Sequence, residues 1–143
     1  SRCLKSNIFL NQVQRKKVIN YFVENKKTNF LIDVTLDLTP GLLLKYNNLY
    51  KKYKIEHNEN IYLKVNKLLN AYKKTKDNAL VNMVVFFIDN FFFQLIKNDV
   101  NKIDILFILK NKILKKINDF IIYNLNISLV LNFIELKLKN AQQ

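Results

Sequence analysis

Hydrophobic residues recur every three or four positions along most of the chain, with polar residues between them. This spacing places the hydrophobic side chains on one face of an α-helix. It is clearest in the second half, where short polar breaks at 75–77, 98–101 and 123–126 separate four amphipathic segments, a pattern that predicts an antiparallel helical bundle. The hydrophobic positions are Ile61, Val65, Leu68, Leu69 and Tyr72; Leu80, Val84, Phe87, Ile88, Phe91 and Leu95; Ile105, Leu106, Leu109, Ile113, Ile117 and Phe120; and Ile127, Val130, Leu131, Ile134 and Leu138.

The second of these segments is hydrophobic nearly all round, which predicts the central helix of the bundle. Its most apolar stretch, 84–96, is interrupted by Asp89, Asn90 and Gln94. A stretch of this length with these interruptions is too short and too polar to cross a bilayer. We therefore expect a buried core helix and no membrane span.

The first half of the chain predicts shorter elements. Leu4 to Leu10 has the composition of a short strand, and Asn11 with Gln14 three residues later predicts a helix N-terminus closed by a capping box. The helix that follows is expected to end near 24–27. The apolar run 30–38 is predicted as a second helix, since its Asp33 and Asp37 are four residues apart.

A third helix is expected over 42–53, after the sequence Thr39, Pro40, Gly41. Thr39 can cap a helix, and Pro40 suits the first helical position, where its missing N–H is not needed. Residues 54–60 are the most polar stretch and mark a domain boundary. The predicted protein is all-α, with an N-terminal run at 1–11, a small three-helix piece at 12–55 and a larger bundle at 56–143.

Composition supports long helices. The 143 residues are 50% hydrophobic and include one Gly and one Pro, too few turn residues for a β-sandwich or barrel. The net charge of +13 would attract nucleic acid or an acidic partner. However, nearly all basic residues are Lys, and the arginines that carry bidentate recognition are limited to Arg2 and Arg15. We interpret the charge as a solvated surface with weak affinity for DNA.

Motifs for catalysis or metal binding are scarce. A single Gly excludes a glycine-rich phosphate loop, and one Cys with one His makes a metal site improbable. His57 would have to be the base of any nucleophilic enzyme, but it lies in the most polar stretch and fits a solvated linker. Asp33 and Asp37 fit ordinary surface charges better than an acid–base pair. The lone Cys3 and the lack of a signal sequence favour a reducing cytoplasm.

Three features carry a resemblance to a known family. The start, Ser1, Arg2, Cys3 and the run 7–10, resembles the end of the ATPase domain of AAA+ clamp-loader subunits, where an SRC motif precedes the last strand. Leu38 to Leu44, through Thr39, Pro40 and Gly41, is similar to a turn in the lid of delta-prime-like subunits. The closing segment 123–134 is similar to the last collar helix of bacterial delta-prime subunits.

The resemblance implies the lid and collar of a delta-prime-like subunit of bacterial DNA polymerase III, without its ATPase core. Such a region would be non-catalytic and would bind no cofactor, because ATP belongs to neighbouring subunits. Arg2 matches the arginine finger that acts on a neighbour's nucleotide, and Ser1 and Cys3 would shape its turn. Collar contacts with other loader subunits would hold the hetero-oligomer that places the sliding clamp on DNA during replication.

Such contacts need an apolar surface on the bundle. The candidate residues are Phe91, Phe92, Phe93, Phe107 and Ile108. The alternative is a basic all-helical module that binds nucleic acid. A small enzyme, and attachment to anionic membranes by a basic amphipathic helix, are weaker hypotheses.

Overall fold

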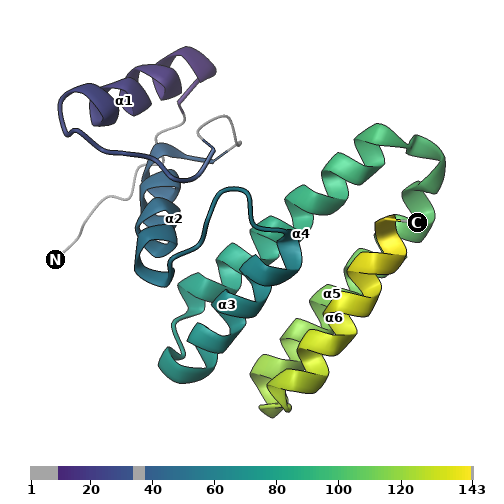
Figure 1. Cartoon of the computed structure of the whole chain (residues 1–143). Coiled ribbons are helices and arrows are strands. Elements are labelled where there is room, and N and C mark those ends of the chain that lie inside the picture. The colour runs from purple at the N-terminus through teal and green to yellow at the C-terminus, as the bar shows by residue number, and fades with distance from the viewer. Residues whose placement is uncertain (1–9, 34–37, 143) are drawn as a thin grey trace, which may run out of the picture. The chain divides into compact units, whose positions relative to one another are not determined.

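The computed structural model describes residues 10–33 and 38–142, and over these residues the protein is all-helical (Figure 1). The prediction of an all-α fold is confirmed, and no strand occurs in the described ranges. The expected strand at Leu4 to Leu10 lies outside them except for Leu10, which is in no regular element. The elements are α1 (Gln12–Glu24), α2 (Pro40–Tyr53), α3 (Ile61–Thr75), α4 (Asn78–Asn98), the 3-10 turn η1 (Val100–Lys102), α5 (Ile103–Tyr123) and α6 (Ile127–Gln142).

The chain divides into two compact units with the boundary between His57 and Asn58. The front unit holds α1 and α2, and the rear unit holds the four longer helices. The boundary falls within the polar stretch 54–60.

Both helices of the front unit begin at the capping residues that the sequence predicts. The Asn11 side chain accepts a hydrogen bond from the Gln14 backbone N–H at 2.9 Å, and Gln14 Oε1 accepts one from the Asn11 N–H at 3.0 Å. The Thr39 hydroxyl oxygen accepts from the Leu42 N–H at 3.4 Å, and Pro40 occupies the first turn of α2. These contacts satisfy backbone donors that have no partner inside a helix.

The helix predicted over 30–38 is wrong for the residues that can be described, because 30–33 and 38 are not helical. Asn47 of α2 is fully buried, and its side chain forms hydrogen bonds with backbone groups at the start of this segment. Its Oδ1 accepts from the Leu31 N–H at 2.7 Å, and its Nδ2 donates to the Asn29 carbonyl at 3.0 Å. The apolar residues Ile32 and Leu38 are buried without the help of a helix, so their spacing was misleading.

The rear unit is the predicted antiparallel bundle (Figure 1). Helix α3 packs against α4 and α6, and α5 packs against the same two helices. The four helices therefore form a ring in which each has two main neighbours, and α4 is not a central helix. The additional hydrophobic residues of α4 are therefore not explained by a central position, and they lie in the second half of the helix.

An aromatic contact lies in the bundle core near the end where α3 leads into α4. The rings of Tyr72 and Phe120 meet edge to face with centroids 6.0 Å apart, and both side chains are buried. At the same end, Lys76 Nζ donates to Asn124 Oδ1 at 3.4 Å, which joins the α3–α4 connection to the α5–α6 connection. Lys76 and Asn124 also end their helices in the left-handed conformation, with φ of 55° and 48°.

Candidate protein-interaction surface

In the rear bundle, α4 and α5, the second and third helices in chain order, are longer than α3 and α6. Helix α3 has 15 residues against the 21 of its partner α4, and α6 has 16 against the 21 of α5. At 1.5 Å per residue the difference amounts to roughly 8–9 Å of helix. In Figure 1 the end of α4 runs on, at the upper right, past the start of α3. We call residues 93–108 of this α4–η1–α5 connection the hairpin tip.

The hairpin tip has little core of its own. No residue from Phe93 to Ile105 is buried, whereas Phe92 just before the tip and Leu106 within its last turn are buried. The tip is nevertheless rich in hydrophobic side chains, and the most exposed, Val100, shows 67% of its surface. The large hydrophobic residues exposed there are Phe93, Val100, Ile103, Ile105, Phe107 and Ile108.

An ion pair fixes how the two helices of the tip face each other. Asp89 Oδ1 of α4 lies 3.1 Å from Lys110 Nζ of α5, and the same Nζ lies 5.4 Å from the centroid of the Phe107 ring. Phe93 is one helical turn beyond Asp89 on the same side of α4. Phe93 and Phe107 therefore lie at the same level and on the same side of the hairpin, which makes a local aromatic surface.

The structure separates the five residues that the sequence suggested as an interface. Phe93, Phe107 and Ile108 are exposed, at 62%, 54% and 52%. Phe91 is half-buried, and its ring meets that of Phe92 edge to face at 5.4 Å. Phe92 is fully buried, so its assignment to an interface is corrected: it is a core residue.

Sequence reasoning missed Val100 and Ile103 and assigned Ile105 to the core-facing side of its helix. Ile105 is 63% exposed in the structure, so it does not face the core. The signal that could have found these residues is length. The second hydrophobic segment is longer than the first in the sequence, so the first cannot cover its far end.

The opposite end of the bundle is basic. Lys73 and Lys74 lie in the last turn of α3, and Lys76 follows as its C-cap; all three are exposed. Cations at a helix C-terminus offset the negative end of the helix dipole. The bundle thus has a lysine-rich end and an apolar end.

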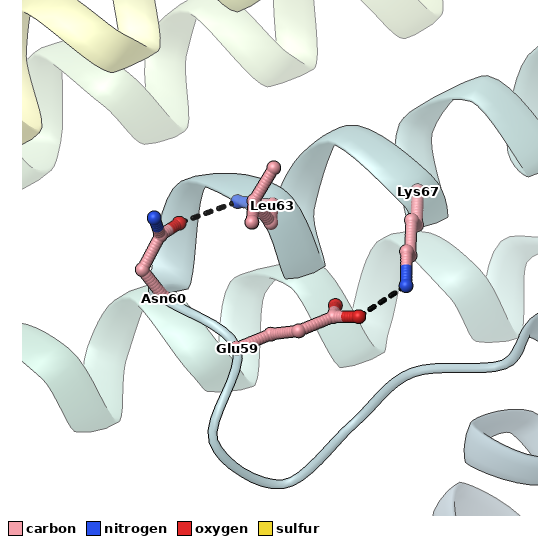
Figure 2. A network of polar contacts seen from close by, with 4 residues as sticks. All are labelled: Glu59, Asn60, Leu63 and Lys67. Atoms are coloured by element: carbon pink, nitrogen blue, oxygen red, sulfur yellow. Dashed lines mark hydrogen bonds and ion pairs between the residues drawn. The ribbon is translucent and has the colours of Figure 1, made fainter.

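A further group of polar residues holds the start of α3 (Figure 2). The Asn60 side chain caps the helix through the Leu63 N–H at 2.9 Å, and Glu59 pairs with Lys67 two turns along. Burial lowers the pKa of Lys64, and the nearby Glu59 carboxylate acts in the opposite direction. These contacts fix the point where the polar stretch joins the bundle and need no ligand to explain them.

A small open hollow of about 140 Å³ lies between this start of α3 and the end of α6. Ligand pockets are usually larger, at roughly 300–1,000 Å³. Beside the hollow, Glu135 accepts a bond from Lys139 at 2.6 Å and so raises the pKa of that amine. The residues that line the hollow are Asn60, Ile61, Tyr62, Glu135, Leu138, Lys139 and Gln142.

The other candidate residues are not brought together. Ser1, Arg2, Cys3 and Asp37 lie outside the described residues. Thr39, Pro40 and Gly41 begin α2, and the Gly41 Cα faces open space. His57 is exposed in the polar stretch. Within the described ranges, no three His, Cys, Asp or Glu side chains are grouped so that they could hold a metal ion.

Helix α4 is long and apolar enough to cross a membrane by length and composition alone. It is longer than the stretch 84–96 on which the opposite expectation rested. In the bundle, however, its first fifteen residues pack against α3 and α5 and contribute seven buried side chains. These contacts are those of a core helix.

Comparisons of the chain with protein-family models, with curated proteins and with solved structures gave no match.

Proposed function

We propose that this protein is a non-catalytic assembly module of the clamp-loader type. In this proposal, the front unit corresponds to the lid and the rear bundle to the collar of a delta-prime-like subunit of bacterial DNA polymerase III. The bundle holds the subunit in a hetero-oligomer that places the sliding clamp on DNA in the cytoplasm. ATP is bound by neighbouring subunits, and Arg2 faces such a site only in the complete assembly.

The observation that carries the proposal is the hairpin tip. Six large hydrophobic side chains are exposed there, while the neighbouring core residues Phe92 and Leu106 are covered. Several large hydrophobic side chains exposed in one short connection are a feature of surfaces that contact other proteins. The order of the two units along the chain adds support. A small helical unit, in which Thr39, Pro40 and Gly41 form the start of α2, is followed by a four-helix bundle.

The proposal is tested by mixing the purified chain with the other clamp-loader subunits of the same organism and separating the mixture by gel filtration. The wild-type chain is expected to enter a complex. The double substitution Phe107→Ser, Ile108→Ser should weaken entry at least tenfold, because each buried hydrophobic side chain contributes about 1.5–3 kcal/mol.

The matched control is Leu129→Ser, because Leu129 is 67% exposed at the start of α6, far from the tip in sequence and at the basic end. Circular dichroism checks that all variants remain helical. The proposal fails if no loader subunit binds the wild-type chain, or if the tip variant enters the complex as readily as the control.

A second candidate is non-specific binding of nucleic acid, which the lysine-rich end favours. Lys73, Lys74 and Lys76 are clustered and exposed there. Their position at a helix C-terminus already has a structural reason, so the cluster supports this function less strongly than the exposed tip supports assembly.

A further inference from the structure

We infer that the face formed by α5 and α6 binds the phosphate backbone of nucleic acid. The binding surface is the basic seam, which we define as Lys112 and Lys116 of α5 with Phe133 and Lys137 of α6. The inference goes beyond the assembly role, because it gives the rear bundle a second partner that is not a protein. It also places that partner on a different pair of helices from the lysine-rich end of α3.

One aromatic ring brings the charges of two helices together. Helices α5 and α6 lie side by side in the bundle (Figure 1). The Lys116 Nζ lies 5.8 Å from the centroid of the Phe133 ring, and the Lys137 Nζ lies 5.4 Å from the same centroid. Lys112 is one helical turn before Lys116, on the same side of α5. Lysines of both helices therefore border the line along which the helices meet.

The three lysines of the seam are not neutralised by the protein. None of them forms an ion pair with a carboxylate of the described residues, and Asp119, three residues after Lys116, is no exception. On the other sides of the same helices, Lys110 pairs with an aspartate of α4 at 3.1 Å, and Lys139 pairs with a glutamate of α6 at 2.6 Å. Unpaired charges of one sign repel each other, so a bound anion stabilises this face.

The two lysines next to the ring are also partly ordered before any ligand binds. Lys116 and Lys137 are half-buried, as is Phe133 between them. An ammonium group close to an aromatic ring gains about 0.5–1 kcal/mol at a surface site. Side chains that are held in this way lose less conformational entropy when an anion binds.

Nucleic acid fits this surface better than an acidic protein does. Duplex DNA carries a continuous row of phosphates, about one charge per 1.7 Å of its axis. The seam offers lysines along a line, whereas carboxylates on a protein are usually scattered among neutral groups. Lysine acts on phosphate as a point charge and reads no base. We therefore expect binding without sequence preference, with a Kd of roughly 1–100 µM at physiological salt.

An anionic membrane is the main competing partner. Leu129 and Leu136 of α6 are exposed, one turn before and one turn after Phe133. Lipid binding uses apolar side chains that enter the bilayer next to lysines. The ring between the two lysines is half-buried, however, so it cannot enter lipid without leaving its contacts in the bundle. A phosphate polymer binds the seam without any such insertion.

The inference is tested by fluorescence anisotropy of the purified full chain with a labelled DNA duplex at several salt concentrations. The double substitution Lys116→Gln, Lys137→Gln should reduce the slope of log Kd against log salt by about 2. At about 0.1 M salt it should weaken binding at least about tenfold. A wild-type chain that does not bind the duplex overturns the inference.

The comparison variant is Lys97→Gln, Lys102→Gln, which removes the same charge from α4 and η1. It should bind nearly like the wild type. If the two double variants lose affinity equally, net charge alone accounts for the binding and the inference is wrong. Circular dichroism checks that both variants remain helical.

A charge-preserving variant separates charge from packing. Lys116→Arg, Lys137→Arg keeps both positive charges and should keep the slope of the wild type. If this variant loses the slope as the Gln variant does, the two side chains act through packing, and the inference fails.

Two further arms identify the anion. Polyglutamate at equal charge should displace the duplex less well than unlabelled duplex does. Vesicles of equimolar phosphatidylcholine and phosphatidylserine should bind the Gln variant of the seam as well as they bind the wild type. Equal displacement by polyglutamate makes the seam a site for acidic protein. A loss of vesicle binding with DNA binding unchanged makes it a lipid surface, and either result overturns the inference.

The inference does not rest on the proposed function, and the two can fail separately. The Gln variant of the seam should enter a complex with loader subunits as readily as the wild type. A chain that enters this complex but binds no DNA refutes the seam and supports the assembly role. A chain that binds DNA through the seam but no loader subunit supports the seam and refutes the assembly role.

Discussion

At the scale of single residues, Asn47 does more for the front unit than its place in a hydrophobic helix face suggests. It is fully buried, and its amide group both accepts from and donates to the segment before α2. Buried polar groups of this kind are expensive when one partner is removed. The backbone at Asn29 and Leu31, where sequence periodicity places the start of a helix, is thus held in a non-helical conformation by one side chain.

We expect Asn47→Leu to lower the free energy of unfolding of the front unit by about 1–3 kcal/mol, because the Leu31 N–H and the Asn29 carbonyl lose their partners. Urea unfolding measured by circular dichroism checks this value. Asn48→Ala on the same helix is the control, since Asn48 is exposed, and should change stability by less than about 0.5 kcal/mol. Equal effects of the two substitutions would refute this role of Asn47.

At the scale of elements, the sequence was a good guide to where helices begin and a poor guide to what covers them. Asn11 and Thr39 were identified correctly as caps, because capping depends on neighbours three residues away. The exposure of Ile105 and the burial of Phe92 could not be predicted from nearby residues in the sequence. Both depend on which other helix lies against each position, and the spacing within one helix does not contain that information.

Two helix ends also carry a local conformational cost in free energy. Lys54 and Lys76 close α2 and α3 with positive φ, a conformation that favours glycine. We expect Lys76→Gly to raise the free energy of unfolding of the bundle by about 0.5–1 kcal/mol. The loss of the Lys76–Asn124 hydrogen bond, at 3.4 Å and exposed, offsets little of this gain.

Lys73→Gly is the matched control for that substitution, because Lys73 lies within α3 with helical backbone angles. The same replacement should there lower the free energy of unfolding by about 1 kcal/mol. Thermal unfolding of both variants measures the two effects. If the two midpoints shift in the same direction, the left-handed conformation of Lys76 is not the deciding factor.

At the scale of the whole molecule, the charge of +13 has a measurable consequence whichever function holds. We expect weak binding to DNA without sequence preference, with log Kd rising steeply with log salt. Replacing Lys73 and Lys74 by Gln should reduce that slope by about 2 if both contact phosphates. Fluorescence anisotropy with a labelled duplex at several salt concentrations measures the slope, and Lys16→Gln, Lys17→Gln on α1 is the control. An unchanged slope in the Lys73, Lys74 variant excludes this end as the contact.

The division of the chain into two units was expected from the polar stretch 54–60, because few contacts cross a segment that has little to bury. The described residues form two compact units on either side of His57. The number of helices in the front unit was harder to predict. Hydrophobic residues such as Ile32 and Leu38 can be buried from a loop as well as from a helix, when a side chain like that of Asn47 supplies the backbone's hydrogen bonds.

The rear unit is also held together by more buried side chains at one end of its axis than at the hairpin tip. Between Phe93 and Ile105 no side chain is fully buried, so less hydrophobic burial opposes the separation of α4 from α5 there than in the rest of the bundle. The ion pair that joins the two helices, Asp89–Lys110, lies just outside this stretch. Local opening should therefore start at this end and meet resistance at the aromatic contact near the other. Any protein that binds the hairpin tip also suppresses this local opening, so binding and local stabilisation of the bundle occur together.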